Sequence, residues 1–438
     1  LLRSHVNLIH TFSKNGAVNE LYHPGIHYGT CTRIFLYMGG HGMEKSGAGR
    51  FQTRYAYEPA GVCLYEPWIY HHINWEVLVS RIISIGTALP AYKHEQMGIM
   101  DFMQRAYAMN EVEKRKLRFL YHHSGIEHRY SVIPDYSRSL PEWKFYPHSE
   151  NLEPFPSLEL RISYYNKHAA ALSVDAIRNC LDGKYKEQDI THLITVSCTG
   201  MSAPGLDLQV MELLDLPKTI YRTSVNFMGC YAAIHALKMA DSICIADQKA
   251  KVLIVCTELC TIHFQRDPSM DNIASSLLFG DGSAAALVTS DDQSTDGFQL
   301  NSFYSEVIPR GKKDMAWELS SSGFLMTLSG YIPDLIEEDF LQLTNKALDG
   351  KSMSIADVDY WCIHPGGRTI LEAIGKSLDL TTDKLKESYD VLRDYGNMSS
   401  PTILFVLKKY LQHKQKNKKL FAAAFGPGLT METFIAST

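Results

Sequence analysis

Apolar residues recur along most of the chain in short runs bounded by glycine and polar residues, a pattern typical of buried strands alternating with helices. Residues Arg81 to Gly86 predict a strand, and the residues after Pro90 show a helical pattern through Tyr107. The pattern also predicts a helix over Arg161 to Leu181 and strands over His192 to Ser197, Lys251 to Cys256 and Ala284 to Thr289. Repeated strand and helix units of this kind predict an α/β fold in which helices cover a sheet.

The second half of this region repeats the element order of the first. In the first half a strand ends near Cys198 and a later helix begins at Cys230. In the second half the strand over Val358 to Ile363 ends at His364, and a later helix begins shortly after Asn397, at nearly the same separation. Strand–helix units resemble one another closely enough for such a match to arise by chance. If the halves are related, functional residues should gather where their strand ends meet.

Residues 1–80 depart from this pattern, because they contain no Asp and their apolar residues show no sustained period. We expect an atypical extension that is disordered or non-native and dispensable for activity, and we do not read its histidines as metal ligands. Residues 81–295 would then form the first half, with a nucleophilic Cys. Residues 296–438 would form the second half, with a His and an Asn.

Composition narrows the function classes. The 438 residues include 43 Lys and Arg against 48 Asp and Glu, a net charge of −5, and 45% are hydrophobic, which argues against a nucleic-acid-binding protein and against disorder. No apolar run reaches the length of about 18 to 20 residues that a membrane-spanning helix needs, and the first residues do not resemble a signal peptide. Nine cysteines without a Cys-x-x-Cys pair predict free thiols, no metal site and a cytoplasmic location.

Three residues are candidates for one site. Cys230 follows a glycine at the predicted start of a helix, where the helix dipole and a cationic partner would favour the nucleophilic thiolate. His364 follows an apolar strand and precedes Pro365, Gly366 and Gly367, a placement common for catalytic histidines. Taken singly, Cys230 also fits an inert core thiol, His364 a structural histidine, and Asn397 a turn or cap residue. Together they fit either a cysteine hydrolase or an enzyme that forms carbon–carbon bonds.

The segments around these residues resemble the type III polyketide synthases, the chalcone and stilbene synthase-like family of the thiolase superfamily, over residues 82–438. The resemblance rests on segments that occur in the family's order: Ala203-Pro204-Gly205-Leu206-Asp207, Gly229-Cys230, Cys256-Thr257-Glu258, Leu278-Phe279-Gly280-Asp281-Gly282, His364-Pro365-Gly366-Gly367, Gly396-Asn397-Met398-Ser399-Ser400 and Phe425-Gly426-Pro427-Gly428-Leu429-Thr430. It implies a thiolase-like αβαβα layered fold made of two related halves, and a homodimer.

The resemblance also implies a reaction. An acyl-CoA starter would load onto Cys230, with His364 pairing with the thiolate. Malonyl-CoA would then lose carbon dioxide, and His364 and Asn397 would stabilise the resulting enolate. The carbanion would extend the chain on Cys230 before the product cyclises. The substrates are CoA thioesters, and neither a metal nor a redox cofactor is needed.

Further residues match family positions. Phe279 matches the gatekeeper between the CoA tunnel and the reaction cavity. The residues that match the substrate and cyclisation pocket are Ala203, Cys260, His263, Trp317, Met326, Ser399, Gly426, Pro427 and Gly428. The basic residues Lys114, Lys116 and Arg118 lie near where the family binds CoA phosphates, although a solvated helix face explains them equally well. Ala424 replaces the first glycine usual in the cyclisation loop.

The pocket positions resemble bacterial members and argue against a flavonoid product. We expect an alkylpyrone or alkylresorcinol made from a fatty acyl-CoA, followed by a tetrahydroxynaphthalene or phloroglucinol product made from malonyl units. The alternatives are a synthase of the KAS III type, which makes a single condensation and uses an acyl carrier protein, and a non-catalytic scaffold of the same fold. A scaffold should have a broken triad, and Cys230, His364 and Asn397 are intact.

Overall fold

A computed structural model describes residues 79–149, 151–290 and 297–438 of the chain. The predicted extension 1–80 therefore lies outside the described residues except for its last two, and the predicted boundary after residue 295 lies in the second gap. All the described residues belong to one compact unit.

The strands of this unit form one large sheet and two small ones. The large sheet contains β1 (Arg81–Ala88), β4 (His192–Ser197), β5 (Tyr221–Asn226), β6 (Lys251–Leu259), β7 (Asp281–Thr289), β8 (Phe298–Val307), β11 (Tyr360–Ile363), β12 (Lys419–Gly426) and β13 (Thr430–Ser437). These nine strands pair in the order β11-β12-β13-β8-β1-β7-β6-β4-β5. The small sheets pair β2 (Tyr92–Glu95) with β3 (His128–Ser131), and β9 (Met315–Ser320) with β10 (Gly323–Leu328).

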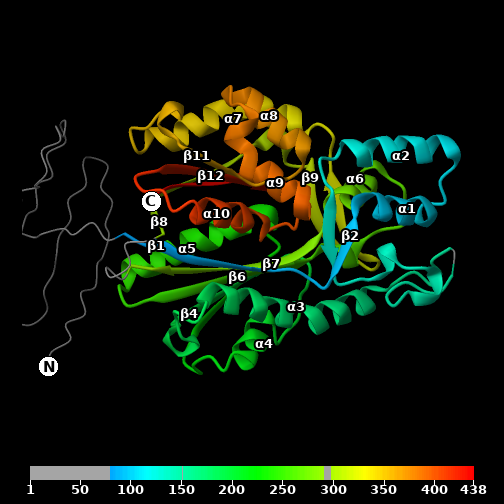
Figure 1. The fold of residues 1–438 in the computed structure, drawn as a ribbon, viewed down its shortest axis with the longest axis horizontal. Coiled ribbons are helices and arrows are strands. Elements are labelled where there is room, and N and C mark those ends of the chain that lie inside the picture. Colours follow the sequence, from blue (N-terminus) through cyan, green and yellow to red (C-terminus); the bar gives the residue numbers. More distant parts are fainter. Residues whose placement is uncertain (1–78, 150, 291–296) are drawn as a thin grey trace, which may run out of the picture. The chain divides into compact units, whose positions relative to one another are not determined.

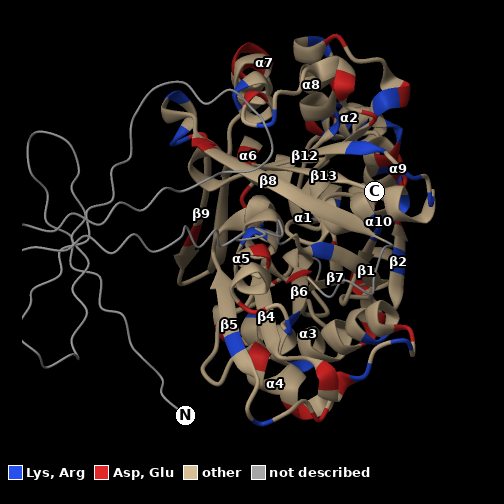
Figure 2. Cartoon of the chain, turned by 90° about the vertical axis from the view of Figure 1, so that its left-hand side faces the viewer, with Lys and Arg blue, Asp and Glu red and all other residues tan. Residues whose placement is uncertain are grey.

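Some helices cover the outer faces of the large sheet, and others lie between its two halves. They are α1 (Gln96–Ala106), α2 (Glu111–His123), α3 (Leu158–Leu181), α4 (Leu206–Leu213), α5 (Ala232–Ala246), α6 (Met270–Leu278), α7 (Ile332–Asp349), α8 (Arg368–Leu378), α9 (Lys386–Tyr395) and α10 (Thr402–Gln412). Charged residues gather on outer helices such as α4, α7 and α8, whereas the strands are largely uncharged (Figure 2). Among the described residues, no helix combines the length and the apolar character needed to cross a membrane.

The layers follow from the period-2 alternation of the strands. On β6, Leu253 and Val255 belong to the core cluster that contains α3, whereas Val252 and Ile254 belong to the central cluster with α5 and α10. β12 behaves in the same way, because its Leu420 and Ala422 also join the central cluster, while its Phe421 and Ala423 pack with α7 and α8. The layers therefore follow one another in this order: helices α3 and α4, the part of the sheet with β6, helices α5 and α10, the part of the sheet with β12, and helices α7 and α8 (Figure 1). This is the αβαβα arrangement that we expected.

Most predicted elements are present with shifted ends. β4 has the predicted bounds, and α3 begins at Leu158, where the Ser157 hydroxyl caps it by accepting a hydrogen bond from the Leu160 N–H. The helix predicted after Pro90 begins only at Gln96, because Tyr92–Glu95 pairs as a strand with His128–Ser131. The local sequence pattern does not indicate this pairing, because the partner strand follows α2 in the sequence.

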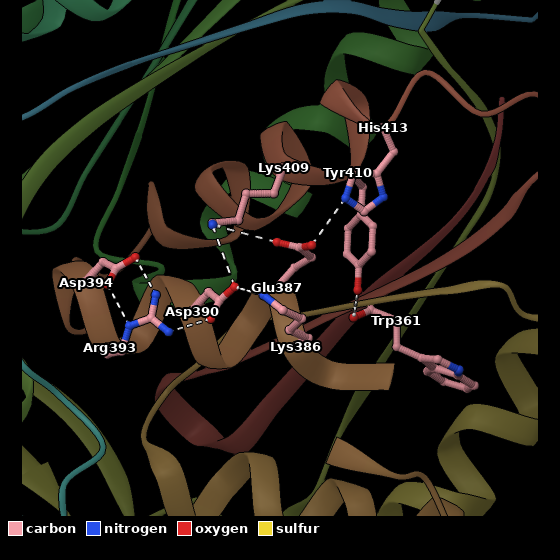
Figure 3. Close-up of polar contacts among 9 residues, drawn as sticks. All are labelled: Trp361, Lys386, Glu387, Asp390, Arg393, Asp394, Lys409, Tyr410 and His413. Carbon is pink, nitrogen blue, oxygen red and sulfur yellow. Dashed lines mark hydrogen bonds and ion pairs between the residues drawn. The ribbon is translucent and has the colours of Figure 1, made fainter. Parts of the chain in front are cut away.

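The segment that carries Asn397 is held at both ends, because it connects α9 to α10. Lys409 of α10 lies 3.7 Å from Glu387 and 4.0 Å from Asp390 of α9, and His413 Nε2 lies 3.2 Å from Glu387 Oε1 (Figure 3). Each contact is worth little on its own where it is exposed. The network links the first half of α9 to the C-terminal end of α10 and so joins the two helices that flank the loop.

Candidate active site

Cys230 lies in a tight turn at the start of α5. A single 3-10 turn over Gly229–Tyr231 precedes the helix, as the sequence predicts for a helix N-terminus. Gly229 has φ +77°, and a Cβ at this position would lie 2.2 Å from Cδ of Pro427. Only glycine therefore lets the loop around Pro427 pack directly beside the cysteine. The Gly229 N–H donates to Cys198 Sγ at 3.0 Å, which ties the turn to the end of β4.

His364 follows β11 directly and is almost fully buried. Its backbone N–H donates to the Ala423 carbonyl of β12 at 2.9 Å, which continues the strand pairing by one residue. Neither ring nitrogen has a hydrogen-bond partner. Buried polar atoms are normally paired, so an imidazole with two unpaired nitrogens at a strand end indicates a group that meets a substrate. Burial lowers the pKa of His364 to about 3, so the ring is neutral and one of its nitrogens has a lone pair that can face a substrate or the thiol.

Asn397 joins the two halves of the site. Its backbone N–H donates to Leu278 O and its carbonyl accepts from the Gly280 N–H, both at 2.9 Å, so it bridges the backbone on either side of Phe279. Its side-chain Nδ2 donates to Gly366 O at 3.2 Å, in the loop that follows His364. One N–H of the carboxamide is therefore occupied, and the other is free for a ligand.

The three predicted residues converge on one cavity. Cys230 Sγ lies 4.0 Å from Asn397 Oδ1 and 3.6 Å from Ser399 Oγ, and Cys230, His364, Asn397 and Ser399 all line the same space. The sequence predicts a lowered thiol pKa, but burial acts in the opposite direction. Burial raises the pKa of Cys230 to about 11, because desolvation of the thiolate outweighs the contacts of the sulfur with Ser399 and Asn397. Without substrate, the favoured pair is thus a neutral thiol and a neutral imidazole.

The cavity has a volume of about 500 Å³, and no Asp or Glu is among its lining residues. Four methionines contribute to its walls: Met103, Met270, Met315 and Met326. Of the family positions predicted for the site, Phe279, Cys260, His263, Trp317, Met326, Ser399 and Pro427 line it.

The other predicted residues do not line this cavity. Ala203 is exposed, and Gly426 and Gly428 flank Pro427 without reaching the space themselves. Lys114, Lys116 and Arg118 lie on α2, whose Leu120 and His123 do line the cavity. The basic residues therefore lie on a helix that borders the cavity but do not line it.

An aromatic wall closes one side of the cavity. His263 stacks on Phe324 with ring centroids 4.3 Å apart, and Trp317 meets both rings edge to face. His263 Nε2 donates to Thr199 O at 2.7 Å, which fixes the tautomer because a carbonyl only accepts. Trp317 Nε1 donates to Cys198 O, also at 2.7 Å. The motif comparison found His263 and Trp317 but missed Phe324, whose only sequence signal is its place in an apolar strand.

Glu258 is a second residue whose role the sequence did not indicate, although it stands in the quoted Cys256-Thr257-Glu258 segment. Its fully buried carboxylate accepts from the Cys198 N–H and Thr199 Oγ1 at 2.8 Å and from Ser400 Oγ at 2.7 Å. Burial raises its pKa to about 7. Glu258 thus connects the end of β4 to the Asn397 loop. Within the described ranges, no cluster of His, Cys, Asp or Glu is arranged to hold a metal ion.

The chain is similar to known proteins over nearly all of its described residues. The family model described as chalcone and stilbene synthases, N-terminal domain, matches residues 78–292, and the corresponding C-terminal domain matches residues 299–438. The chain is 33% identical over 281 residues to the alpha-pyrone synthesis polyketide synthase-like Pks18 of Mycobacterium tuberculosis, covering 62% of this chain and 71% of that protein.

Two further matches extend over more of the chain. Probable polyketide synthase 1 of Dictyostelium discoideum is 29% identical over 369 residues, which cover 81% of this chain but only 11% of that much longer protein. The crystal structure of PKS-I from the brown alga Ectocarpus siliculosus superposes with a TM-score of 0.78 at 26% identity, covering 83% of this chain and 100% of that one.

Proposed function

The chain belongs to the chalcone and stilbene synthase family of type III polyketide synthases, which are acyltransferases with a thiolase-like fold, and we propose that it makes alkylpyrones or alkylresorcinols. In this proposal a fatty acyl-CoA is the starter and malonyl-CoA the extender. Cys230 carries the growing chain. His364 takes part in loading the starter, and His364 and Asn397 together bind the enolate formed from malonyl-CoA.

The loading step uses the neutral pair described above. The Cys230 thiol passes its proton to His364 as sulfur attacks the thioester carbonyl of the starter. The bond from that carbonyl to the CoA sulfur breaks, and the CoA thiolate takes the proton from His364. Proton transfer within the pair avoids a lasting buried charge, which both shifted pKa values disfavour.

Extension uses the same donors on malonyl-CoA. Loss of carbon dioxide leaves an enolate, whose oxygen accepts hydrogen bonds from His364 and from the free N–H of Asn397. The carbanion attacks the Cys230 thioester, so a carbon–carbon bond forms and the sulfur leaves as thiolate. The extended chain is then a CoA thioester, and a repeat of the loading step returns it to Cys230 before the next extension. After the last extension, attack of an enol oxygen on the thioester carbonyl closes a pyrone and expels CoA as the thiolate, which takes up a proton.

The observation that carries the choice of starter is the chemistry of the cavity wall. An alkyl chain is flexible and has no polar groups, and unbranched methionine side chains adapt to such a ligand. Met315, Met326 and Leu328 of the β9–β10 hairpin all line the cavity beside the reactive residues. The absence of acidic residues among its lining also suits the anionic malonyl group.

Met326→Trp should shorten the starters that the enzyme accepts. Close-packed walls do not stretch, so a larger ring removes the space for the distal methylenes. We expect kcat/KM for a long-chain acyl-CoA to fall on the order of 100-fold, with little change for a short-chain starter or for malonyl-CoA decarboxylation. Product analysis by mass spectrometry over a series of starter lengths measures this.

The matched control is Leu325→Trp, because Leu325 is the neighbouring residue on β10, faces away from the cavity and is partly exposed. It should leave the starter profile unchanged. An identical profile in Met326→Trp and the wild type would contradict the placement of the alkyl chain.

A homodimer and a cytoplasmic location are parts of the same proposal. β5 is a terminal strand of the large sheet, with its first four residues exposed, and Tyr221 is 71% exposed. An edge of this kind favours pairing with a second copy. The seven cysteines of the described residues are all free thiols, which fits a reducing compartment.

A further inference from the structure

Ser399 is a closer neighbour of the reactive sulfur than Asn397. Its Oγ lies 3.6 Å from Cys230 Sγ, within the range of hydrogen bonds to sulfur, and its side chain is buried in the cavity wall. Ser399 lies in the loop between α9 and α10, whereas Cys230 lies in the turn that precedes α5. The sequence identified it only as a residue that shapes the pocket.

The backbone of Ser399 is held in a conformation that side chains rarely adopt. Its φ is +59°, a left-handed value that costs free energy in any residue other than glycine and persists where the surroundings impose it. Three contacts impose it. The Ser399 N–H donates to Asn397 Oδ1 at 2.8 Å, its carbonyl accepts from the Thr402 N–H at 3.1 Å, and Thr402 Oγ1 accepts from the Met398 N–H at 2.8 Å. The hydroxyl is therefore pre-positioned beside the sulfur.

The surroundings of the sulfur explain why a neutral donor is useful there. Four titratable groups influence or border it: Glu258, Cys198, Cys260 and His364. Glu258 disfavours the thiolate by its charge, the two thiols are buried and neutral, and His364 is neutral. A hydroxyl can stabilise the thiolate without bringing a second charge into the cavity.

We propose that the Ser399 hydroxyl donates a hydrogen bond to the Cys230 thiolate and is a catalytic residue of the loading step. When the thiol proton moves to His364, the hydroxyl turns from accepting the S–H to donating toward the sulfur. The same bond stabilises Cys230 as a leaving group after each condensation. This inference rests on the proposed function, because it assigns a role within the acyl transfer proposed above.

The test is the pH dependence of iodoacetamide labelling at Cys230 in the full chain, followed by peptide mass spectrometry. In Ser399→Ala and Ser399→Gly, loss of the donor should raise the thiol pKa by about one unit, which slows labelling about tenfold at a pH below the pKa. Ser399→Gly tolerates the positive φ, so it keeps the loop conformation if alanine does not.

Ser400→Ala is the control for a general loosening of the loop. Its hydroxyl bonds Glu258 rather than the sulfur, and losing it raises the Glu258 pKa and weakens the negative charge that opposes the thiolate. The thiol pKa should therefore stay unchanged or fall, opposite to the effect of Ser399→Ala.

A wild-type thiol pKa in Ser399→Gly would overturn the inference. Acyl loading from acyl-CoA is followed separately by intact-protein mass spectrometry. A wild-type protein that takes up no acyl group, but shows the shift in Ser399→Gly, would contradict the proposed function and support the hydrogen bond.

Discussion

Cys230→Ala should abolish acyl loading and polyketide formation while leaving the protein folded. In the proposed reaction the Cys230 thiol holds the chain as a thioester. Its packing contribution is small, because Cys230 borders the cavity and alanine is tolerated at the start of a helix. Intact-protein mass spectrometry after incubation with acyl-CoA should show one acyl adduct on the wild type and none on the variant, with a similar Tm.

Cys244→Ala is the matched control. Cys244 lies on the same helix, α5, but is buried in the central core and does not line the cavity. Its replacement should preserve the adduct. An acyl adduct that persists on Cys230→Ala would assign the nucleophile to another residue, of which Cys198 and Cys260 are the thiols that share the cavity.

His364→Ala and Asn397→Ala should both reduce turnover, but at different steps. Each removes a donor to the enolate, which at comparable oxyanion sites costs on the order of 10² to 10³ in rate. Only His364 also accepts the thiol proton, because a neutral imidazole has a basic ring nitrogen and a carboxamide has none. We therefore expect slow acyl loading in His364→Ala, and near-normal loading with slow malonyl-CoA decarboxylation in Asn397→Ala.

Single-turnover measurements separate the two steps, by adduct formation from the starter and by release of carbon dioxide from malonyl-CoA. Equal loading rates in His364→Ala and the wild type would show that His364 does not accept the thiol proton. Undiminished decarboxylation in Asn397→Ala would remove Asn397 from the enolate site.

The sequence predicted the framework of this fold well because the framework depends on local patterns. Short apolar runs located β4 and β6, and the repeat of strand end and helix start located Cys230 and Asn397 at matching points of the two halves. The pairing of β2 with β3 escaped prediction, because it depends on a partner more than 30 residues away.

The sequence patterns could not predict which side chains point into the cavity or how deeply they are buried. Gly426 and Pro427 are neighbours in one predicted loop, yet only Pro427 lines the cavity. The helix dipole at Cys230 was visible in the sequence and favours a lower thiol pKa, whereas the desolvation that raises it depends on the folded surroundings. The place of Phe324 in the aromatic wall could not be predicted, because it depends on stacking against His263, a residue far from it in the chain.

The most direct test of the account is the product formed when the purified protein is incubated with malonyl-CoA and a series of fatty acyl-CoA starters. Mass spectrometry should find a cyclised, CoA-free alkylpyrone or alkylresorcinol, whose side chain matches the starter. A β-ketoacyl thioester extended by a single malonyl unit, with no cyclised product from any starter, would contradict the assignment of iterative extension and ring closure to this site.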